Sequence, residues 1–266
     1  MARWATGESV LARAARMLEA FEHDQRVLTV AEIARKADLP VPTAHRLVAQ
    51  LLDVGFLERD DGNRVRIGLH LWEIAALGAQ APHLREAAMP YLEQVHVATQ
   101  RHTQLDVLEG KDVLVVEWLK AREALKGLPL QAGRRVPAHA MAGGAVLLAH
   151  ADTRLQEEIL AGPLARYNDR TPTDPRELRR LWAHARQTGY VVCDGFVSPK
   201  ALSIAVPVAG TDGKVAAAIG VVIPASDTQR MALVPVLLAA ARGIGQALRT
   251  HVPAGSARMR LHLPPA

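Results

Sequence analysis

The chain has 266 residues, a length that fits one large domain or two of modest size. A hydrophobic share of 49% and a charged share of 22% are ordinary for folded proteins and exclude general disorder. The single cysteine, Cys193, excludes an internal disulfide and any metal site built from several thiolates. No apolar run approaches the roughly 18 residues of a membrane helix, and the N-terminus lacks an apolar leader. We therefore expect a cytoplasmic protein with no membrane partner.

Positive charge is spread unevenly along the chain. There are 32 Lys and Arg against 27 Asp and Glu, a net charge of +5, which is compatible with a nucleic-acid partner. Residues 1–75, however, hold ten basic and eleven acidic residues, and the basic excess lies later, for example over residues 166–186. Net charge by itself is therefore no argument for DNA binding.

Three helices are expected in the first 55 residues. Apolar residues recur at three- and four-residue steps over residues 9–21, which predicts an amphipathic helix. A second helix begins after Thr29, because Thr29 and Glu32 have the spacing of a capping box. Pro42 suits the first turn of a third helix, since proline lacks only an amide that has no partner there. The second and third helices, joined by a tight turn near Pro40, form a helix-turn-helix pattern.

A β-hairpin is expected directly after the third helix. The dipeptide Asp61-Gly62 lies between two short strand-like segments, residues 56–59 and 64–67, and it is a strong hairpin signal. Helices followed at once by a hairpin predict a winged helix-turn-helix DNA-binding domain, which we place at residues 1–68.

The rest of the chain mixes helices with strands. Residues 69–82 are expected to form a helical linker that Ala81-Pro82 interrupts, and residues 252–266 a flexible tail. Between them, residues 83–251 predict an α+β domain with a sensor-type sheet. Its expected elements are helices 83–99, 138–149, 174–188 and 227–251 and strands 103–108, 113–118, 126–130, 190–193, 202–208 and 215–223.

One face of the third helix carries the side chains expected to read DNA. Thr43, Arg46 and Gln50 lie opposite its apolar stripe, with His45 at the edge. Arg46 can place its guanidinium on guanine or on a phosphate, and Gln50 can pair with adenine. An ordinary solvated helix face has a similar composition, but the order of the surrounding elements favours the DNA-binding interpretation. The candidate DNA-contacting residues are Pro42, Thr43, His45, Arg46 and Gln50 on the helix and Arg64 and Arg66 on the hairpin.

Several motifs resemble the IclR-type bacterial transcriptional regulators. In the first part they are Ser9-Val-Leu-Ala-Arg-Ala, Thr29-Val-Ala-Glu-Ile-Ala, Leu39-Pro-Val-Pro-Thr-Ala-His-Arg-Leu47, Gly55-Phe-Leu and Arg66-Ile-Gly-Leu69. In the second part they include Leu84-Arg-Glu-Ala-Ala-Met-Pro-Tyr-Leu92, Gly189-Tyr190 and Ser203-Ile-Ala-Val-Pro-Val208. The resemblance covers about residues 9–250. It implies a dimeric or tetrameric regulator that reads a palindromic operator and has a C-terminal effector-binding domain similar to GAF and PAS sensors.

Departures from the family's pattern indicate the kind of effector. The loop motif Ala-Thr-Ala-x-Gly-Lys of the family reads Ala140-Met-Ala-Gly-Gly-Ala145 here, so its Thr and Lys are absent. The Asp, Cys and two Ser of the family's cleft fall by register on Cys193, Ser203, Gly220 and Val222. The resemblance therefore implies a flatter, more hydrophobic or aromatic effector than small α-keto acids, in a mostly apolar concavity. The candidate effector-binding residues are Met141, Gly143, Gly144, Cys193, Ser203, Gly220 and Val222.

Other interpretations of these positions stay open. The same substitutions also fit simple repacking of a sheet. Arg134, Arg135 and His139 border the loop and are able to clamp a ligand carboxylate, although an exposed arginine is the simpler interpretation. Pro42 stands where the family commonly has Ser, which removes one hydroxyl and one amide donor from the groove-facing surface.

Two competing classes of function remain to be weighed. The chain has no Gly-x-Ser-x-Gly, His-Glu-x-x-His, P-loop or Gly-x-Gly-x-x-Gly motif, so we expect no catalysis, cofactor or metal. The second competitor is a winged-helix DNA-binding protein whose C-terminal domain only oligomerises, with no small-molecule ligand. Operator binding that no metabolite changes would favour it. Repressors and activators, as homodimers or homotetramers, are all compatible with this layout.

Overall fold

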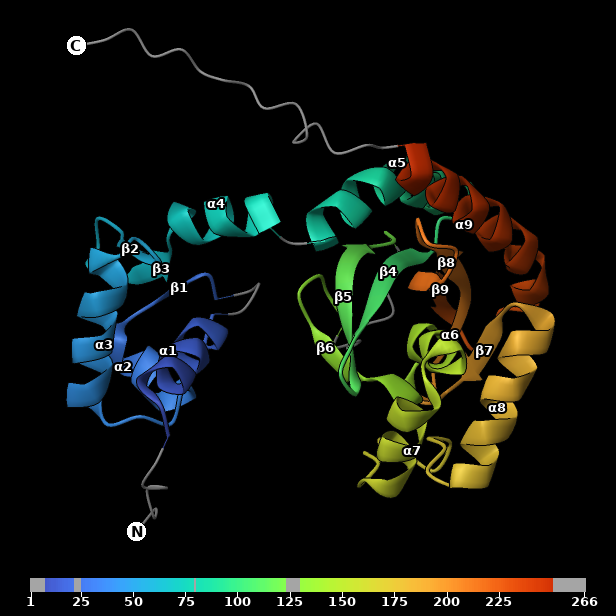
Figure 1. The fold of residues 1–266 in the computed structure, drawn as a ribbon, viewed down its shortest axis with the longest axis horizontal. Helices are drawn as coiled ribbons and strands as arrows, with labels where there is room; N and C mark the ends of the chain where they lie inside the picture. The colour runs from blue at the N-terminus through green and yellow to red at the C-terminus, as the bar shows by residue number, and fades with distance from the viewer. Residues whose placement is uncertain (1–7, 22–24, 79, 123–129, 251–266) are drawn as a thin grey trace, which may run out of the picture. The chain divides into compact units, whose positions relative to one another are not determined.

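The computed structural model describes residues 8–21, 25–78, 80–122 and 130–250 (Figure 1). The chain divides into two compact units, residues 1–79 and 80–266, and each has its own buried apolar core. The expected tail and most of the expected strand at 126–130 lie outside the described residues.

The first unit is a winged helix-turn-helix. The capping box at the start of its second helix is confirmed, since the Thr29 amide donates to Glu32 at 2.8 Å and the Glu32 amide donates to the Thr29 hydroxyl. The hairpin is confirmed as an antiparallel pair of strands. The elements are α1 (Val10–Glu19), β1 (Val27–Leu28), α2 (Val30–Lys36), α3 (Val41–Asp53), β2 (Leu57–Arg59), β3 (Val65–Ile67) and α4 (Leu69–Gly78).

Strand β1 was not among the expected elements. The small sheet has the order β1-β3-β2, and Val27 and Leu28 of β1 pair with Arg66 and Val65 of β3. Two residues are too few to show the period of two that marks a strand in a sequence. This segment is a strand only because it pairs with β3, which lies nearly 40 positions further along the chain.

The second unit has the predicted α+β fold. In its described residues six antiparallel strands form a sheet of order β6-β5-β4-β9-β8-β7. Short 3-10 turns at Ala138–Ala140 and Arg230–Ala232 precede two of its helices. The elements are α5 (Gln80–Thr99), β4 (His102–Glu109), β5 (Asp112–Leu119), β6 (Arg135–Pro137), α6 (Ala142–His150), α7 (Thr153–Ala161), α8 (Pro175–Thr188), β7 (Val191–Asp194), β8 (Ala201–Ala209), β9 (Val215–Pro224) and α9 (Leu233–Thr250).

Helices cover both faces of this sheet (Figure 1). Helices α5 and α9 lie side by side over one face, where Leu105 and Ile219 are buried among their apolar side chains. Helix α6 covers the other face, where Ala205 and Ala218 are buried, and α7 and α8 add apolar side chains to the same core. Because alternate residues of a strand point to opposite faces, each strand supplies both cores. The face that packs on α6 is the one that carries the candidate effector residues.

The second unit differs from expectation at several elements. Helix α5 begins at Gln80, so Ala81 and Pro82, where an interruption was expected, lie within it, and α4 ends at Gly78. Strand β6 and helix α7 had not been predicted, although Asp152 caps α7 by accepting from the Leu155 amide at 2.7 Å. The helix expected from residue 138 begins at Ala142, after a 3-10 turn. The helix expected from Asp227 begins only at Leu233. Asp227 instead accepts from the Gln229 amide and pairs with Arg101 at 2.7 Å, which makes a turn there.

By length and composition, the segment Arg230–Thr250 in the described part of the chain would also suit a membrane span. Its apolar residues have another use in this fold. Leu237 and Ile244 are fully buried in the core that α9 shares with α5 and the sheet. A core helix of this kind satisfies the same composition criterion as a membrane helix, so the segment is weak support for a span.

Candidate functional site

Helix α3 presents an exposed polar face. Pro42, His45, Arg46 and Gln50 are exposed and Thr43 is half-buried, whereas the apolar stripe of the same helix is buried. Within the described residues, no side-chain hydrogen bond or ion pair engages His45, Arg46 or Gln50. This face therefore offers a guanidinium, an imidazole and an amide to an outside partner.

The two candidate arginines of the hairpin are paired with carboxylates of the same hairpin. Arg64 Nη2 lies 3.1 Å from Asp60 Oδ2, and Arg66 Nη2 lies 3.1 Å from Glu58 Oε2. Each arginine side chain still keeps 55% of its surface exposed. An exposed ion pair contributes only about 0 to 1 kcal/mol, so a DNA phosphate can compete for either arginine.

Backbone amides hold those carboxylates in place. Asp60 Oδ1 accepts from the amides of Gly62 and Arg64 at 3.0 and 2.8 Å, and Glu58 Oε1 accepts from the Leu69 amide at 2.9 Å. The Arg64 amide is the main cause that lowers the pKa of Asp60, and the Leu69 amide has the same effect on the pKa of Glu58. Both groups therefore stay ionised at neutral pH and orient the arginines of the hairpin.

The second unit contains a cavity at the start of α6. Four of the candidate effector residues line it: Met141 before α6, Cys193 on β7, Ser203 on β8 and Val222 on β9. The sheet register brings three of them together, because Cys193 pairs with Ser203 and Ser203 pairs with Val222. Residues that pair directly across strands lie on the same face. His102 of β4 pairs with Val222 and extends this row to a fourth strand.

The candidates Gly143 and Gly144 lie in the first turn of α6 and are not part of the cavity lining. A side chain on Gly143 would collide with the carboxylate of Asp106. A side chain on Gly144 would collide with the backbone of Ala138. The two glycines therefore let α6 pack closely on β4 and on the turn before it. The last candidate, Gly220, lies in the next row of the sheet, where it pairs with Gln104.

The cavity is small and its described lining carries no formal charge. Its volume is about 30 Å³, which is room for about one or two water molecules. A cavity of roughly 150 Å³ is known to accept benzene, so an aromatic ring needs side chains here to move. The remaining lining residues are Gln104, Leu130, Ala140, Phe196, Val197, Ser198 and Ala201.

Strand β4 contributes polar side chains that were not among the expected site residues. His102, Gln104 and Asp106 alternate along the strand and are all buried. The ring of His102 stacks on Trp118, and its Nδ1 accepts from the Ala121 amide at 3.1 Å. Burial lowers the pKa of His102, which favours the neutral ring. The signal in the sequence was the pair Gln104 and Asp106, two polar residues at alternate positions of the strand predicted at 103–108.

Gln104 and Asp106 form a buried pair. Gln104 Nε2 donates to Asp106 Oδ2 at 2.6 Å. Burial raises the pKa of Asp106 to about 7, and the hydrogen bond from Gln104 acts in the opposite direction. One oxygen of each residue, Gln104 Oε1 and Asp106 Oδ1, is buried and has no hydrogen-bond partner in the described structure. Such oxygens are uncommon in folded proteins, and a ligand or a water can supply the missing hydrogen bond.

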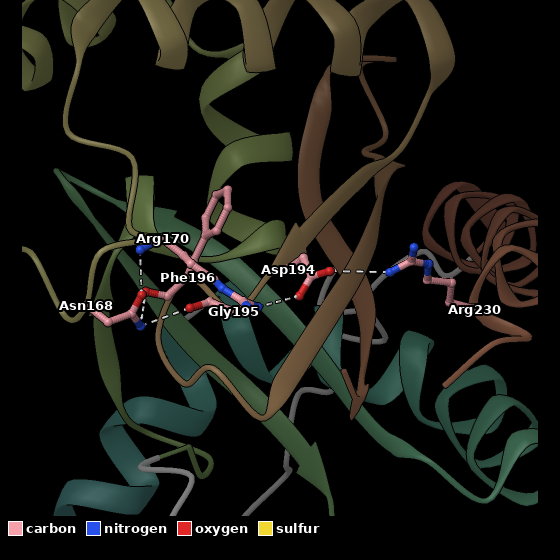
Figure 2. Close-up of polar contacts among 6 residues, drawn as sticks. All are labelled: Asn168, Arg170, Asp194, Gly195, Phe196 and Arg230. Atoms are coloured by element: carbon pink, nitrogen blue, oxygen red, sulfur yellow. Dashed lines mark hydrogen bonds and ion pairs between the residues drawn. The ribbon is translucent and has the colours of Figure 1, made fainter. Parts of the chain in front are cut away.

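The turn between β7 and β8, residues 195–200, forms one side of the cavity, and we call it the strap. Asn168 Nδ2 donates to the carbonyls of Gly195 and Phe196 at 2.9 and 3.3 Å, as Figure 2 shows. The Thr171 hydroxyl donates to the Phe196 carbonyl at 2.6 Å. Phe196, Val197 and Ser198 of the strap all line the cavity. These hydrogen bonds tie one side of the cavity to residues 168–171.

Asp194, just before the strap, joins two arginines (Figure 2). Its Oδ1 lies 3.3 Å from Arg170 Nη1 and its Oδ2 lies 3.3 Å from Arg230 Nη1. Arg170 belongs to the segment that holds the strap, and Arg230 lies in the turn before α9. The two ion pairs of Asp194 therefore link the residues beside the strap to the turn before α9.

The other positions considered for a ligand have different roles. Arg134 and Arg135 are exposed and are not in the described lining. His139 is buried, its Nε2 lies 2.9 Å from the Ala165 carbonyl, and burial lowers its pKa. Burial raises the pKa of the Cys193 thiol, which keeps it protonated and unreactive. No cluster of three metal-ligating side chains occurs among the residues that the structure describes.

Two domain families match most of the chain. Residues 10–61 match the IclR helix-turn-helix domain, and residues 78–248 match the family described as bacterial transcriptional regulator IclR C-terminal. The chain is 29% identical over 239 residues to the Pca regulon regulatory protein of Pseudomonas putida. The aligned region covers 88% of this chain and 82% of that protein. It is 26% identical over 247 residues to the p-hydroxybenzoate hydroxylase transcriptional activator of Acinetobacter baylyi, and the aligned region covers 91% of each of the two chains.

A solved structure gives the same result in three dimensions. An IclR homolog from Microbacterium hydrocarbonoxydans, crystallised in complex with 4-hydroxybenzoate, is 42% identical. It aligns with a TM-score of 0.83 over 91% of this chain and all of that one. The chain belongs to the IclR family of bacterial transcriptional regulators, which are DNA-binding proteins and not enzymes.

Proposed function

We propose that this regulator responds to a small aromatic or hydrophobic effector, which occupies the cavity at the start of α6 and changes the protein's affinity for its operator. The observation that carries the proposal is the mostly apolar lining of that cavity in the described residues. Pyruvate and an aromatic acid both carry a carboxylate that needs donors to replace its water, so the carboxylate does not distinguish them. A ring with one or two polar groups needs mainly apolar contact, which Met141, Phe196 and Val222 supply.

The relatives support an aromatic effector. The Microbacterium homolog was crystallised with 4-hydroxybenzoate, and one Acinetobacter relative is named for activating the p-hydroxybenzoate hydroxylase gene. Four of the seven candidate effector residues, Met141, Cys193, Ser203 and Val222, line the cavity here, and we propose them as contacts. Gly143, Gly144 and Gly220 act by allowing close packing around it.

The cavity must expand to admit a ring, and this expansion gives binding a route to the rest of the domain. Met141 is flexible, and Phe196 lies on the strap, so both are able to move outward. Movement of the strap acts on Asn168 through the strap carbonyls and on Arg230 through Asp194. Coupling between an effector and operator binding is typically worth about 1 to 3 kcal/mol.

On the DNA side we propose that α3 enters the major groove and that the hairpin contacts the backbone or the minor groove. The proposed contacts are Pro42, Thr43, His45, Arg46 and Gln50 on α3 and Arg64 and Arg66 on the wing. A homodimer or homotetramer acting in the cytoplasm would read a palindrome. Its half-sites would lie about 34 Å, or roughly 10 base pairs, apart. Repression and activation both use this arrangement.

Fluorescence anisotropy with the DNA that flanks the protein's own gene tests the proposal. The wild type should bind tightly and with strong salt dependence, and Arg46→Ala should lose about 1 to 3 kcal/mol of binding. Arg180→Ala, an exposed arginine of α8 in the second unit, is the matched control and should bind as the wild type does. Loss of discrimination at one base would identify Arg46 as a base contact, and equal weakening on all sequences would identify a phosphate contact.

The effector is tested in the same assay. Addition of 4-hydroxybenzoate should shift the operator affinity by about 5- to 150-fold, in either direction. Tight binding of a small α-keto acid without binding of aromatic acids would contradict the proposed effector class. Operator binding that stays the same with every metabolite would favour the second candidate, a winged-helix protein whose C-terminal unit only oligomerises.

A further inference from the structure

Gln104 is the polar side chain of the cavity that has the least freedom. It is 1% exposed, it lines the cavity, and its Oε1 is buried with no hydrogen-bond partner among the described residues. Ser198 and Ser203 also line the cavity, but a hydroxyl can rotate and either donate or accept. An amide oxygen can only accept. The chemistry of Gln104 is therefore the most selective in the lining.

The orientation of the Gln104 amide is set by Asp106. Nε2 donates to Asp106 Oδ2 at 2.6 Å, so the amide nitrogen is committed on that side. Asp106 is fully buried, and the first turn of α6 packs against its carboxylate at Gly143. The carboxylate has no room to move away. The oxygen Oε1 is then the polar atom that Gln104 has left to offer to the cavity.

The residues that flank Gln104 in the sheet donate no hydrogen bond to that oxygen in the described structure. On one side, its row continues with Gly220 of β9 and Ala205 of β8, which have no side-chain donor. On the other side, it pairs with Trp118 of β5, whose ring stacks on His102. Val222, one step along β9, is apolar as well. No described side chain of this part of the sheet satisfies Oε1, so an occupant of the cavity must do so.

We propose that Gln104 Oε1 accepts a hydrogen bond from a hydroxyl or amine of the effector, so that the cavity selects aromatic molecules carrying a hydrogen-bond donor over analogues without one. The inference rests on the proposed function, and it adds the residue that determines specificity. An analogue without the donor leaves Oε1 buried and unpaired. Such a group costs enough to weaken binding roughly 10- to 100-fold.

The test compares two probes of nearly equal shape, 4-hydroxybenzoate and 4-fluorobenzoate, on the full chain. Isothermal titration calorimetry gives the Kd of each. The wild type should bind the hydroxyl compound roughly 10- to 100-fold more tightly than the fluoro compound. In Gln104→Met, which keeps the length of the side chain but has no amide, the ratio should fall to within about 3-fold.

A matched control separates recognition from a general effect on β4. Thr103→Val removes a polar group from the adjacent residue, which is also buried but lies on the opposite face, and it should keep the wild-type ratio. The wild-type ratio needs no variant, so an absent preference overturns the inference even if Gln104→Met is unstable.

The failure of this inference is distinguishable from failure of the proposed function. If the wild type binds both benzoates with equal affinity, or if Gln104→Met keeps the preference, the role of Gln104 is overturned and the aromatic effector stands. If the wild type binds neither benzoate, the aromatic effector of the proposed function is overturned, and the role of Gln104 falls with it. Pyruvate titrated in parallel shows whether a compact acid binds instead.

Discussion

The exposed face of α3 and the cavity beside α6 are proposed binding surfaces of opposite kinds. On α3, Arg46 and Gln50 are exposed, so water satisfies their polar groups and the fold loses nothing by carrying them. At the cavity, Gln104 and Asp106 are buried, and each has an oxygen without a partner. A buried unsatisfied group of this kind costs about 1 to 3 kcal/mol. Changes on α3 should therefore affect binding alone, whereas changes at the cavity should affect stability and binding together.

Asp106→Asn should produce the largest change in stability. Burial raises the pKa of Asp106 to about 7 from 3.8, so the unfolded chain releases this proton at lower pH than the folded protein does. The free energy of unfolding should therefore fall as the pH rises from about 4 to about 7. Asn keeps an oxygen for Gln104 and cannot ionise. At pH 8 it should be more stable than the wild type by up to about 4 kcal/mol.

Thermal unfolding of the two proteins at several pH values checks this prediction. The plots of unfolding free energy against pH for the wild type and Asp106→Asn should converge near pH 4 and separate above it. Asp169→Asn, the same substitution at an exposed position, should follow the wild type throughout. A variant that is less stable than the wild type at pH 8 would mean that the ionised carboxylate is stabilised in the fold, for instance by the amides at the start of α6.

Gly144→Ala should have the next largest effect. Its new Cβ would meet the backbone carbonyl of Ala138, which cannot rotate away as a side chain can. The free energy of unfolding should fall by about 2 to 3 kcal/mol, measured by denaturant titration, and effector affinity should fall with it. Gly162→Ala, where the nearest atom is 3.5 Å from the Cβ, is the control and should change stability by less than about 0.5 kcal/mol. Equal effects at the two glycines would contradict the close packing of α6.

Arg64→Ala on the wing should change stability least, by less than about 0.5 kcal/mol, because its ion pair with Asp60 is exposed. Its operator affinity should nevertheless decrease, and the salt dependence of binding should lose about one unit of slope. Lys214→Ala, on the β8–β9 turn of the second unit, removes a comparable charge and should leave the slope unchanged. An unchanged slope in Arg64→Ala would remove the wing from the DNA interface and leave α3 alone in it.

Local chemistry made much of this fold predictable. The capping box of Thr29 and Glu32 and the turn after Asp60 depend on residues within four positions of one another. The start of α8 at Pro175, capped by Asp174, is of the same kind. The exposed face of α3 also follows from the helical period, because residues three and four apart share a side. The residues proposed to contact DNA could therefore be identified from the sequence.

The residue pattern along the chain was enough to predict the helix-turn-helix, the capped starts of α2 and α8, most of the strands and the polar face of α3. Tertiary packing alone made Val27 and Leu28 pair with β3, placed Gln104 opposite Gly220, and left one oxygen each of Gln104 and Asp106 without a hydrogen-bond partner in the described structure. These features join residues that lie nearly 40 to more than 100 positions apart. No local period encodes such pairs, because sheet register and burial arise when distant segments pack. The raised pKa of Asp106 has the same origin, since only the packed fold removes water from its carboxylate.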